Sequence, residues 1–224
     1  MTIRALFLNC TLKASSGLSN TQALIDKVAE QFAKLGVETE SLRVVDHKVA
    51  FGSAMDEGNG DGWPGVLDRI RAADILVIAS PVWLGERSSV AKMVAERLDA
   101  TTYKIDSRKQ HEMYGKVGGA IAIGESDGGQ GVIKSVLYDM SIVGFTIPPN
   151  VDVYWVNEAG MGGDYLESRG DTNYFVNERV RWMAANLTYM ARLLKENPIP
   201  TDLAALMSEA QGVSRPQKHL EARQ

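Results

Sequence analysis

The residues best suited to chemistry lie in a hydroxyl-rich stretch near the start of the chain, residues 10–21. It contains Thr11, Ser19 and Thr21 together with one cation, Lys13. Hydroxyl and ammonium groups donate hydrogen bonds, and those made to a phosphate are strengthened by its charge. An apolar run precedes the stretch and a helical pattern follows it, so the free N–H groups of a helix start would point into it. This arrangement predicts a phosphate site, with an ordinary polar loop and a helix cap at Ser19 as the alternative.

Two later stretches have unusual compositions that complement the first. Residues 80–88 contain Pro81, Trp83 and Gly85, which suit a rigid border against which a flat ring can lie. Residues 124–131 are rich in glycine, which leaves backbone N–H groups exposed. A ligand with a phosphate at one end and a planar heteroaromatic ring at the other would use all three stretches, and FMN has that shape.

The elements that must position these stretches alternate between strands and helices. Short apolar runs predict buried strands, and apolar residues at helical spacing follow each of them. This alternation predicts an α/β protein with a doubly wound parallel sheet, in which ligands bind beyond the carboxyl ends of the strands. The predicted strands span residues 3–9, 37–45, 74–80, 117–123 and 151–156, and a long final helix spans residues 174–195.

Two segments stand apart from this pattern. Residues 46–63 hold several glycines and acidic residues and read as a long mobile loop or lid, not as a calcium loop, because the oxygen ligands lack the required spacing. The single strand–helix pattern predicts one domain over residues 1–196. Pro198 and Pro200 break the last helix, so residues 197–224 form a partly helical tail. The tail is read as frayed, with an inter-subunit arm as the alternative.

The composition narrows the class of protein. The chain has 224 residues, 45% of them hydrophobic, and a net charge of −4. Without a basic cluster, a nucleic-acid partner is not expected. Neither a membrane-spanning run nor a signal peptide is recognisable, so the expected location is the cytoplasm. The single cysteine, Cys10, excludes an internal disulfide and a cluster ligated by several cysteines of one chain.

Through these motifs, the chain resembles the flavodoxin-like NADPH-dependent FMN reductases. The resemblance covers most of residues 3–195 and rests on residues 9–13 with 19–21, on residues 80–85 and on residues 124–129. It implies a flavodoxin-like five-stranded parallel sheet with strand order 2-1-3-4-5. Some relatives carry an iron–sulfur cluster after the second strand, but residues 46–63 contain no cysteine, so the resemblance is to members without a cluster.

The resemblance also implies a function. Members bind FMN, accept a hydride from NAD(P)H as co-substrate, and pass electrons to a quinone, a free flavin or a similar flat acceptor. No dedicated catalytic acid or base is expected, and members form homodimers or homotetramers with the flavin near a subunit contact. The implied phosphate ligands are Thr11, Lys13, Ser19, Asn20 and Thr21; the isoalloxazine ring is bordered by Pro81, Val82, Trp83, Leu84 and Gly85; its pyrimidine edge lies by Gly124, Glu125, Ser126, Asp127, Gly128 and Gly129.

Three further expectations follow. Glu125 and Asp127, if they lie near the ring, disfavour its anionic reduced form and lower the reduction potential, whereas they have no such effect if they point to solvent. Tyr165 or its neighbours cover the flavin of the same or an adjacent subunit. The hydroxyl-rich stretch is expected to be mobile when empty, because it has few apolar anchors.

Two other functions fit parts of the sequence. Gly124 to Gly128 reads Gly-x-Ser-x-Gly, which is the nucleophile elbow of many hydrolases and would make Ser126 the nucleophile. Only His219 follows it, in a polar tail, and an oxyanion motif is missing. A flavodoxin-type electron carrier would share the fold and the cofactor, but carriers are usually far more acidic.

Overall fold

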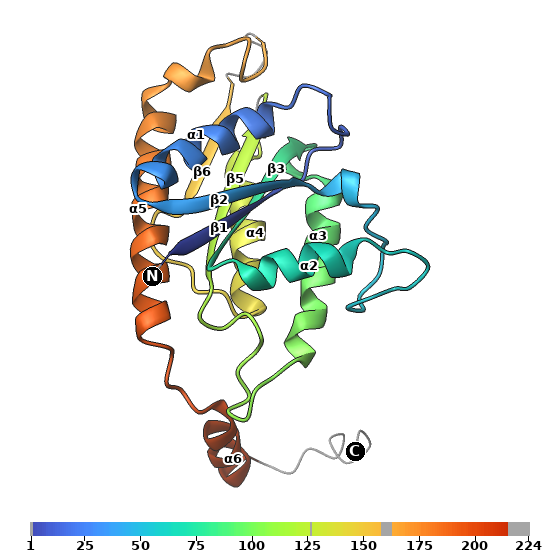
Figure 1. Cartoon of the computed structure of the whole chain (residues 1–224), viewed down its shortest axis with the longest axis vertical. Helices are drawn as coiled ribbons and strands as arrows, with labels where there is room; N and C mark the ends of the chain where they lie inside the picture. The colour runs from blue at the N-terminus through green and yellow to red at the C-terminus, as the bar shows by residue number, and fades with distance from the viewer. Residues whose placement is uncertain (1, 126, 158–162, 215–224) are drawn as a thin grey trace.

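The computed structural model describes residues 2–125, 127–157 and 163–214. It confirms the doubly wound parallel sheet, with neighbouring strands in the order β2-β1-β3-β5-β6 (Figure 1). The two-residue strand β4 pairs antiparallel with β3 outside this path, so the five main strands follow the expected order 2-1-3-4-5. The strands are β1 Ile3–Asn9, β2 Val37–Arg43, β3 Ile75–Trp83, β4 Glu86–Arg87, β5 Val117–Gly124 and β6 Asp152–Val156.

Helices cover both faces of the sheet. α1 and α5 pack on one face, and α2, α3 and α4 pack on the other, each side with its own apolar core. The α-helices are α1 Asn20–Lys34, α2 Trp63–Ala72, α3 Ser89–Asp99, α4 Gly129–Ile142, α5 Tyr174–Glu196 and α6 Leu203–Val213. Short 3-10 turns are η1 Val44–His47, η2 Ala100–Tyr103 and η3 Gly170–Thr172.

Strand β1 is apolar from Ala5 to Leu8 because both of its faces are buried there. Leu6 and Leu8 belong to the core under α2, α3 and α4, whereas Ala5 and Phe7 belong to the core under α1 and α5. The Phe7 ring packs against Phe32 of α1, with centroids 5.8 Å apart. A central strand of a parallel sheet therefore reads as a continuous apolar run instead of an alternating one.

Strand β5 carries two consecutive glycines that allow helices to approach the sheet closely. A Cβ atom on Gly118 would lie 2.8 Å from Ile147 Cδ1 and 2.9 Å from the methyl carbon of Met140 in α4. A Cβ atom on Gly119 would lie 2.9 Å from the methyl carbon of Met183 in α5. The side chains of the flanking elements thus occupy the space that any other residue would need.

Two elements differ from their predictions. β3 continues past the predicted end at residue 80 to Trp83, and Pro81 pairs in parallel register with Ile123 of β5. The predicted long mobile loop over residues 46–63 is instead an anchored one. Asp61 accepts hydrogen bonds from backbone N–H groups of this loop and forms a buried ion pair with Arg97 of α3.

The segment after α5 is held at one point of the body. The side chains of Arg108 and Gln110 both donate to the carbonyl of Ile199, at 3.2 and 3.0 Å, and Gln110 also donates to Thr201. Beyond this contact α6 is helical, as the sequence predicts for part of the tail, but it buries none of its residues. Over the described residues, none of the helices combines the length and the apolar character needed to cross a membrane.

Candidate functional site

A cavity of about 620 Å³ opens beyond the carboxyl ends of β1, β3 and β5. Its volume lies in the range of roughly 300–1,000 Å³ that is typical of small-molecule sites. The three predicted stretches meet here, and every predicted site residue lines the cavity except Ser126, Gly128 and Gly129. Ser126 lies outside the described residues. The lining residues are Thr11, Leu12, Lys13, Ser19, Asn20, Thr21, Pro81, Val82, Trp83, Leu84, Gly85, Ile123, Gly124, Glu125, Asp127, Trp155, Asp164 and Tyr165.

The buried side chain of Asn9, the last residue of β1, shapes the start of the first loop. Its amide nitrogen donates to Gln22 Oε1 of α1 at 2.9 Å, and its oxygen accepts the Thr11 N–H at 3.1 Å. One side chain thus links the strand end, the loop and the following helix. This link fixes where Thr11 stands relative to the start of α1.

Two buried serines join the first loop to the second. Ser88 donates its hydroxyl proton to the Cys10 carbonyl at 2.7 Å, and the Ser80 hydroxyl accepts the Ser88 N–H at 2.9 Å. Ser88 also caps α3, since its hydroxyl oxygen accepts the Ala91 N–H. The thiol of Cys10 is itself buried, and burial raises its pKa well above the ordinary value, which fits a packing role and not a nucleophile.

The end of the cavity at the start of α1 collects hydrogen-bond donors. Ser19 caps the helix by accepting the Gln22 N–H at 3.2 Å, which leaves its own hydroxyl proton free to donate into the cavity. The N–H groups of a first helical turn have no partner within the helix and favour an anion. Over the described residues, the Lys13 ammonium makes no hydrogen bond or ion pair, so its charge is available at the same end.

Asn20 lines the cavity, but its side chain is occupied by another part of the chain. Its oxygen accepts the Leu166 N–H at 3.2 Å, and a hydrogen bond from Asn20 lowers the pKa of Asp164, helped by the backbone N–H of Glu167 and the charge of Lys13. Asn20 therefore fixes the segment around Asp164 against the start of α1. The Asn20 side chain is therefore engaged elsewhere, and its backbone N–H is the group that remains for the predicted contact with a phosphate.

The segment fixed by Asn20 carries Tyr165 into the wall of the cavity. Tyr165 is only 2% exposed and packs edge-on against Trp155 of β6, with ring centroids 5.4 Å apart. Burial raises the pKa of its hydroxyl to about 12, and that hydroxyl has no partner among the described residues. Tyr165 thus lines the cavity, and its role as a cover over a flavin stays a prediction. Asp164 and Trp155 also line the cavity and were not named as site residues.

The end of the cavity at the hairpin between β3 and β4 carries apolar side chains. Leu84 and Gly85 form its turn, both with positive φ, of 52° and 81°. Trp83 is 54% exposed and Leu84 is fully exposed at the rim. This end can accept a flat ring, as the residue types predict.

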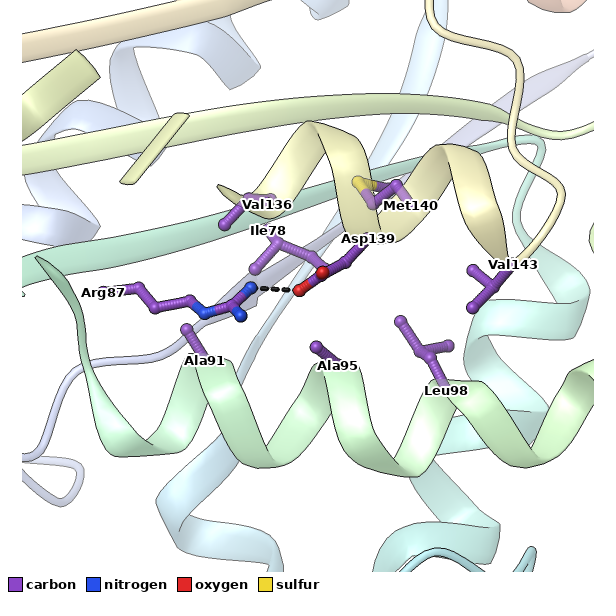
Figure 2. A pocket seen from close by; sticks show the side chains of 9 residues that line it. All are labelled: Ile78, Arg87, Ala91, Ala95, Leu98, Val136, Asp139, Met140 and Val143. Carbon is purple, nitrogen blue, oxygen red and sulfur yellow. Dashed lines mark hydrogen bonds and ion pairs between the residues drawn. The ribbon is translucent and has the colours of Figure 1, made fainter. Parts of the chain in front are cut away.

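An ion pair fixes the base of this hairpin to the helices beneath it. Arg87 of β4 points toward Asp139 of α4, and the two side chains are joined across a small apolar space of about 10 Å³ between α3 and α4 (Figure 2). Ala91, Ala95 and Leu98 of α3 line that space from one side. The hairpin is thus attached to α4.

Gly128 and Gly129 serve packing instead of lining the cavity. A Cβ on Gly128, where φ is 80°, would lie 2.7 Å from the backbone of Gly85, and a Cβ on Gly129 would lie 2.9 Å from the Tyr154 ring. Glu125 and Asp127 do line the cavity, and both are exposed. Their influence on the reduction potential of a flavin stays a prediction.

The cavity lining holds groups suited to both parts of a flavin phosphate. The hydroxyls, the N–H groups at the start of α1 and the Lys13 ammonium suit the phosphate, and Pro81, Val82 and Trp83 suit the ring. Within the described residues no group of His, Cys, Asp and Glu side chains could hold a metal ion.

Comparisons with known proteins identify the family of this chain. A family model described as NADPH-dependent FMN reductase matches residues 3–160. The chain is 39% identical to an 8-demethyl-8-aminoriboflavin-5′-phosphate synthase from Streptomyces davaonensis over 219 residues, which are 94% of this chain and 85% of that protein.

Solved structures extend the comparison to the fold. A structure of RosB with bound 8-demethyl-8-formylriboflavin-5′-phosphate is similar with a TM-score of 0.87 and 36% identity, over 99% of this chain and 94% of that one. A flavodoxin from the Archaea, at 12% identity and a TM-score of 0.54 over 85% of this chain and 99% of its own, shares the fold. The chain therefore belongs to the NADPH-dependent FMN reductase family and has its flavodoxin-like fold.

Proposed function

We propose that this chain binds FMN in the cavity and passes a hydride from NAD(P)H through it to a quinone, a free flavin or a similar flat acceptor. The observation that carries the proposal is the meeting of three distant loops around one cavity, whose lining combines hydrogen-bond donors with apolar side chains. When bound, a flavin supplies the redox chemistry itself, and the protein supplies binding and orientation.

The roles of the residues follow from their positions. Thr11, Lys13, Ser19 and Thr21 would hold the phosphate, with the first N–H groups of α1. The hairpin with Pro81, Val82, Trp83, Leu84 and Gly85 would border one side of the ring, and Gly124 would leave room at its edge. These groups orient the ring and exclude water from part of it, and no described side chain is required as an acid or base.

The test is the spectrum of the purified protein after addition of FMN. Under anaerobic conditions, NADPH or NADH alone is expected to bleach the flavin absorbance, and a quinone is expected to restore it. A reductase needs no partner protein for this cycle, whereas an electron carrier does. Failure of both nicotinamides to reduce the bound flavin would contradict the proposal and favour the carrier.

A second candidate function is modification of the bound flavin. It is favoured by the similarity to a synthase that makes an aminoriboflavin phosphate and to a structure that holds a formyl derivative of riboflavin phosphate. In this case riboflavin phosphate is a substrate and not a resident cofactor. Mass spectrometry of the flavin after aerobic turnover distinguishes the two: an unchanged mass supports the reductase, and replacement of the 8-methyl group supports modification.

The hydrolase alternative can be tested at the same time. Ser126→Ala is expected to leave flavin reduction nearly unchanged, because a reductase needs no serine nucleophile. An esterase activity in the unaltered protein that this substitution abolishes would instead favour the nucleophile elbow.

Assembly into homodimers or homotetramers is part of the same proposal. It is supported by three apolar side chains at the rim of the cavity: Leu12, Trp83 and Leu84 are 46%, 54% and 103% exposed. Light scattering at several protein concentrations gives the subunit number. A monomer at all concentrations would contradict this part.

Lys13→Met is expected to weaken FMN binding by about 1.5–3 kcal/mol, the usual worth of a hydrogen bond to a charged group. This corresponds to a roughly 10- to 150-fold rise in Kd for FMN. The Kd for riboflavin, which lacks the phosphate, should change little in the same variant. The matched control is Lys34→Met, which removes an exposed cation from the far end of α1. Equal losses for FMN and riboflavin would contradict the assignment of Lys13 to the phosphate.

A further inference from the structure

The loop that follows β1 is curled around one guanidinium group supplied by β2. Nη1 of Arg43 donates to the carbonyl oxygens of Ala14 at 2.7 Å, of Gly17 at 2.9 Å and of Lys13 at 3.4 Å. Arg43 is the last residue of β2 and pairs in register with Asn9, the last residue of β1. The strand register therefore places this cation directly beside the loop.

A second group from the same sheet edge holds the middle of the loop. Asp46 of η1 accepts the Ser15 N–H at 2.9 Å and also pairs with the Ser15 hydroxyl. These hydrogen bonds from Ser15 lower the pKa of Asp46, which keeps it ionised. Ser15 is thereby occupied outside the cavity. The anchors of this loop are polar and not apolar, and its mobility when empty stays a prediction.

The direction of the carbonyl groups matters for an anion. A carbonyl oxygen repels a phosphate, whereas N–H and hydroxyl groups attract it. Three carbonyls of this loop turn to Arg43, which does not line the cavity, while Thr11, Lys13 and Ser19 of the same loop do. The guanidinium thus draws the acceptors of the loop away from the side on which a ligand would lie.

We propose that Arg43 is a positioning residue that makes this site selective for a phosphorylated flavin over riboflavin. It acts without touching the ligand, by drawing the carbonyl groups of Lys13, Ala14 and Gly17 away from the phosphate while the Lys13 side chain lines the cavity. This inference rests on the proposed flavin site. It adds a specificity determinant contributed by β2, a strand that supplies none of the lining residues.

The test compares the dissociation constants of FMN and riboflavin by fluorescence titration. For Arg43→Met we expect the Kd for FMN to rise by roughly tenfold or more, while the Kd for riboflavin stays within about twofold. Arg43→Lys should recover part of the preference for FMN. All three carbonyls are contacted by one nitrogen of Arg43, and a lysine ammonium also offers three hydrogens on one nitrogen. Arg4→Met, which removes an exposed arginine of β1 paired with Glu38, is the matched control and should leave both constants unchanged.

The outcomes separate this inference from the proposed function. If the unaltered chain binds neither flavin, the proposed function fails. If the unaltered chain prefers FMN and Arg43→Met weakens both flavins equally, or keeps the preference, Arg43 is only structural and the inference is overturned. Should Arg43→Met not fold, Asp46→Asn carries the test, with a smaller loss of preference for FMN expected and an unchanged preference overturning the inference.

Discussion

Arg97→Met is expected to lower the free energy of unfolding by about 3–5 kcal/mol, the usual cost of removing one partner of a buried ion pair. The side chains of Arg97 and Asp61 are both fully buried, with Nη2 and Oδ2 2.6 Å apart. Arg97 also donates to the carbonyls of Ala50 and Ala54 and lies over the Trp63 ring. Its loss leaves the buried Asp61 carboxylate without its cation and two carbonyls without their donor.

Urea unfolding followed by tryptophan fluorescence measures this loss. The control is Lys92→Met on the same helix, because Lys92 pairs with Glu96 at 3.4 Å on the exposed surface. An exposed pair of this kind contributes at most about 1 kcal/mol. Similar losses in the two variants would show that the Arg97 pair contributes no more than a surface pair does.

The same pair makes stability depend on pH. Burial alone would raise the pKa of Asp61, but hydrogen bonds from the Ala50 N–H and from Arg97 outweigh it and hold the pKa well below its ordinary value of about 3.9. A carboxyl group with a lower pKa in the folded state stabilises the fold above the unfolded-state pKa and loses this contribution as the pH falls through the folded-state pKa. As the pH is lowered below about 4, the free energy of unfolding should therefore fall less steeply for Asp61→Asn than for the unaltered chain. Urea unfolding at a series of pH values measures this dependence.

Gly128→Ala is expected to cost about 2–5 kcal/mol of stability and to impair flavin binding. Its φ of 80° is strained for any residue with a Cβ, at about 1–2 kcal/mol. The added Cβ would also lie 2.7 Å from the Gly85 backbone and from Val82 Cγ1, and such overpacking typically costs about 1–3 kcal/mol. The hairpin must move away from α4 to relieve this contact. Because Val82 and Gly85 line the cavity, the movement should impair flavin binding.

Thermal unfolding and FMN titration together test this prediction. Gly65→Ala is the matched control, since a Cβ there meets no atom within 4 Å and the residue lies inside α2. That change should stabilise the fold by about 0.4–1 kcal/mol. Normal FMN affinity in a destabilised Gly128→Ala protein would mean that the hairpin does not depend on this contact.

The convergence of the three loops could be predicted from the sequence because it follows from topology. Once the strands are recognised as parallel, their carboxyl ends share one edge, and the residue types there indicate the ligand. The outlines of β1 and β5 were equally predictable, because strands buried on both faces leave long apolar runs.

Other parts of the site leave no local signal. Asn20 and Leu166 are 146 residues apart in the chain, and no periodicity marks their hydrogen bond. An asparagine at a helix start serves equally well as an anion ligand or as a link to another segment, and residue type does not distinguish them. Pro81 suggests the end of a strand, since it cannot donate to a ladder. Yet β3 continues to Trp83, because Pro81 lies in register with β5 and the next two residues pair with β4.

The consecutive glycines of β5 have a consequence for how relatives of this chain can diverge. At Gly118 and Gly119 the sheet is no thicker than its backbone, with Met140 of α4 on one side and Met183 of α5 on the other. Close-packed interiors transmit displacement, so a methyl group at either position must push aside the ends of these side chains, and a larger group must move the helices themselves. Since α4 begins beside the hairpin and α5 follows the segment that carries Tyr165, the width of the ligand cleft can change through substitutions deep in the molecule while every cleft residue stays the same.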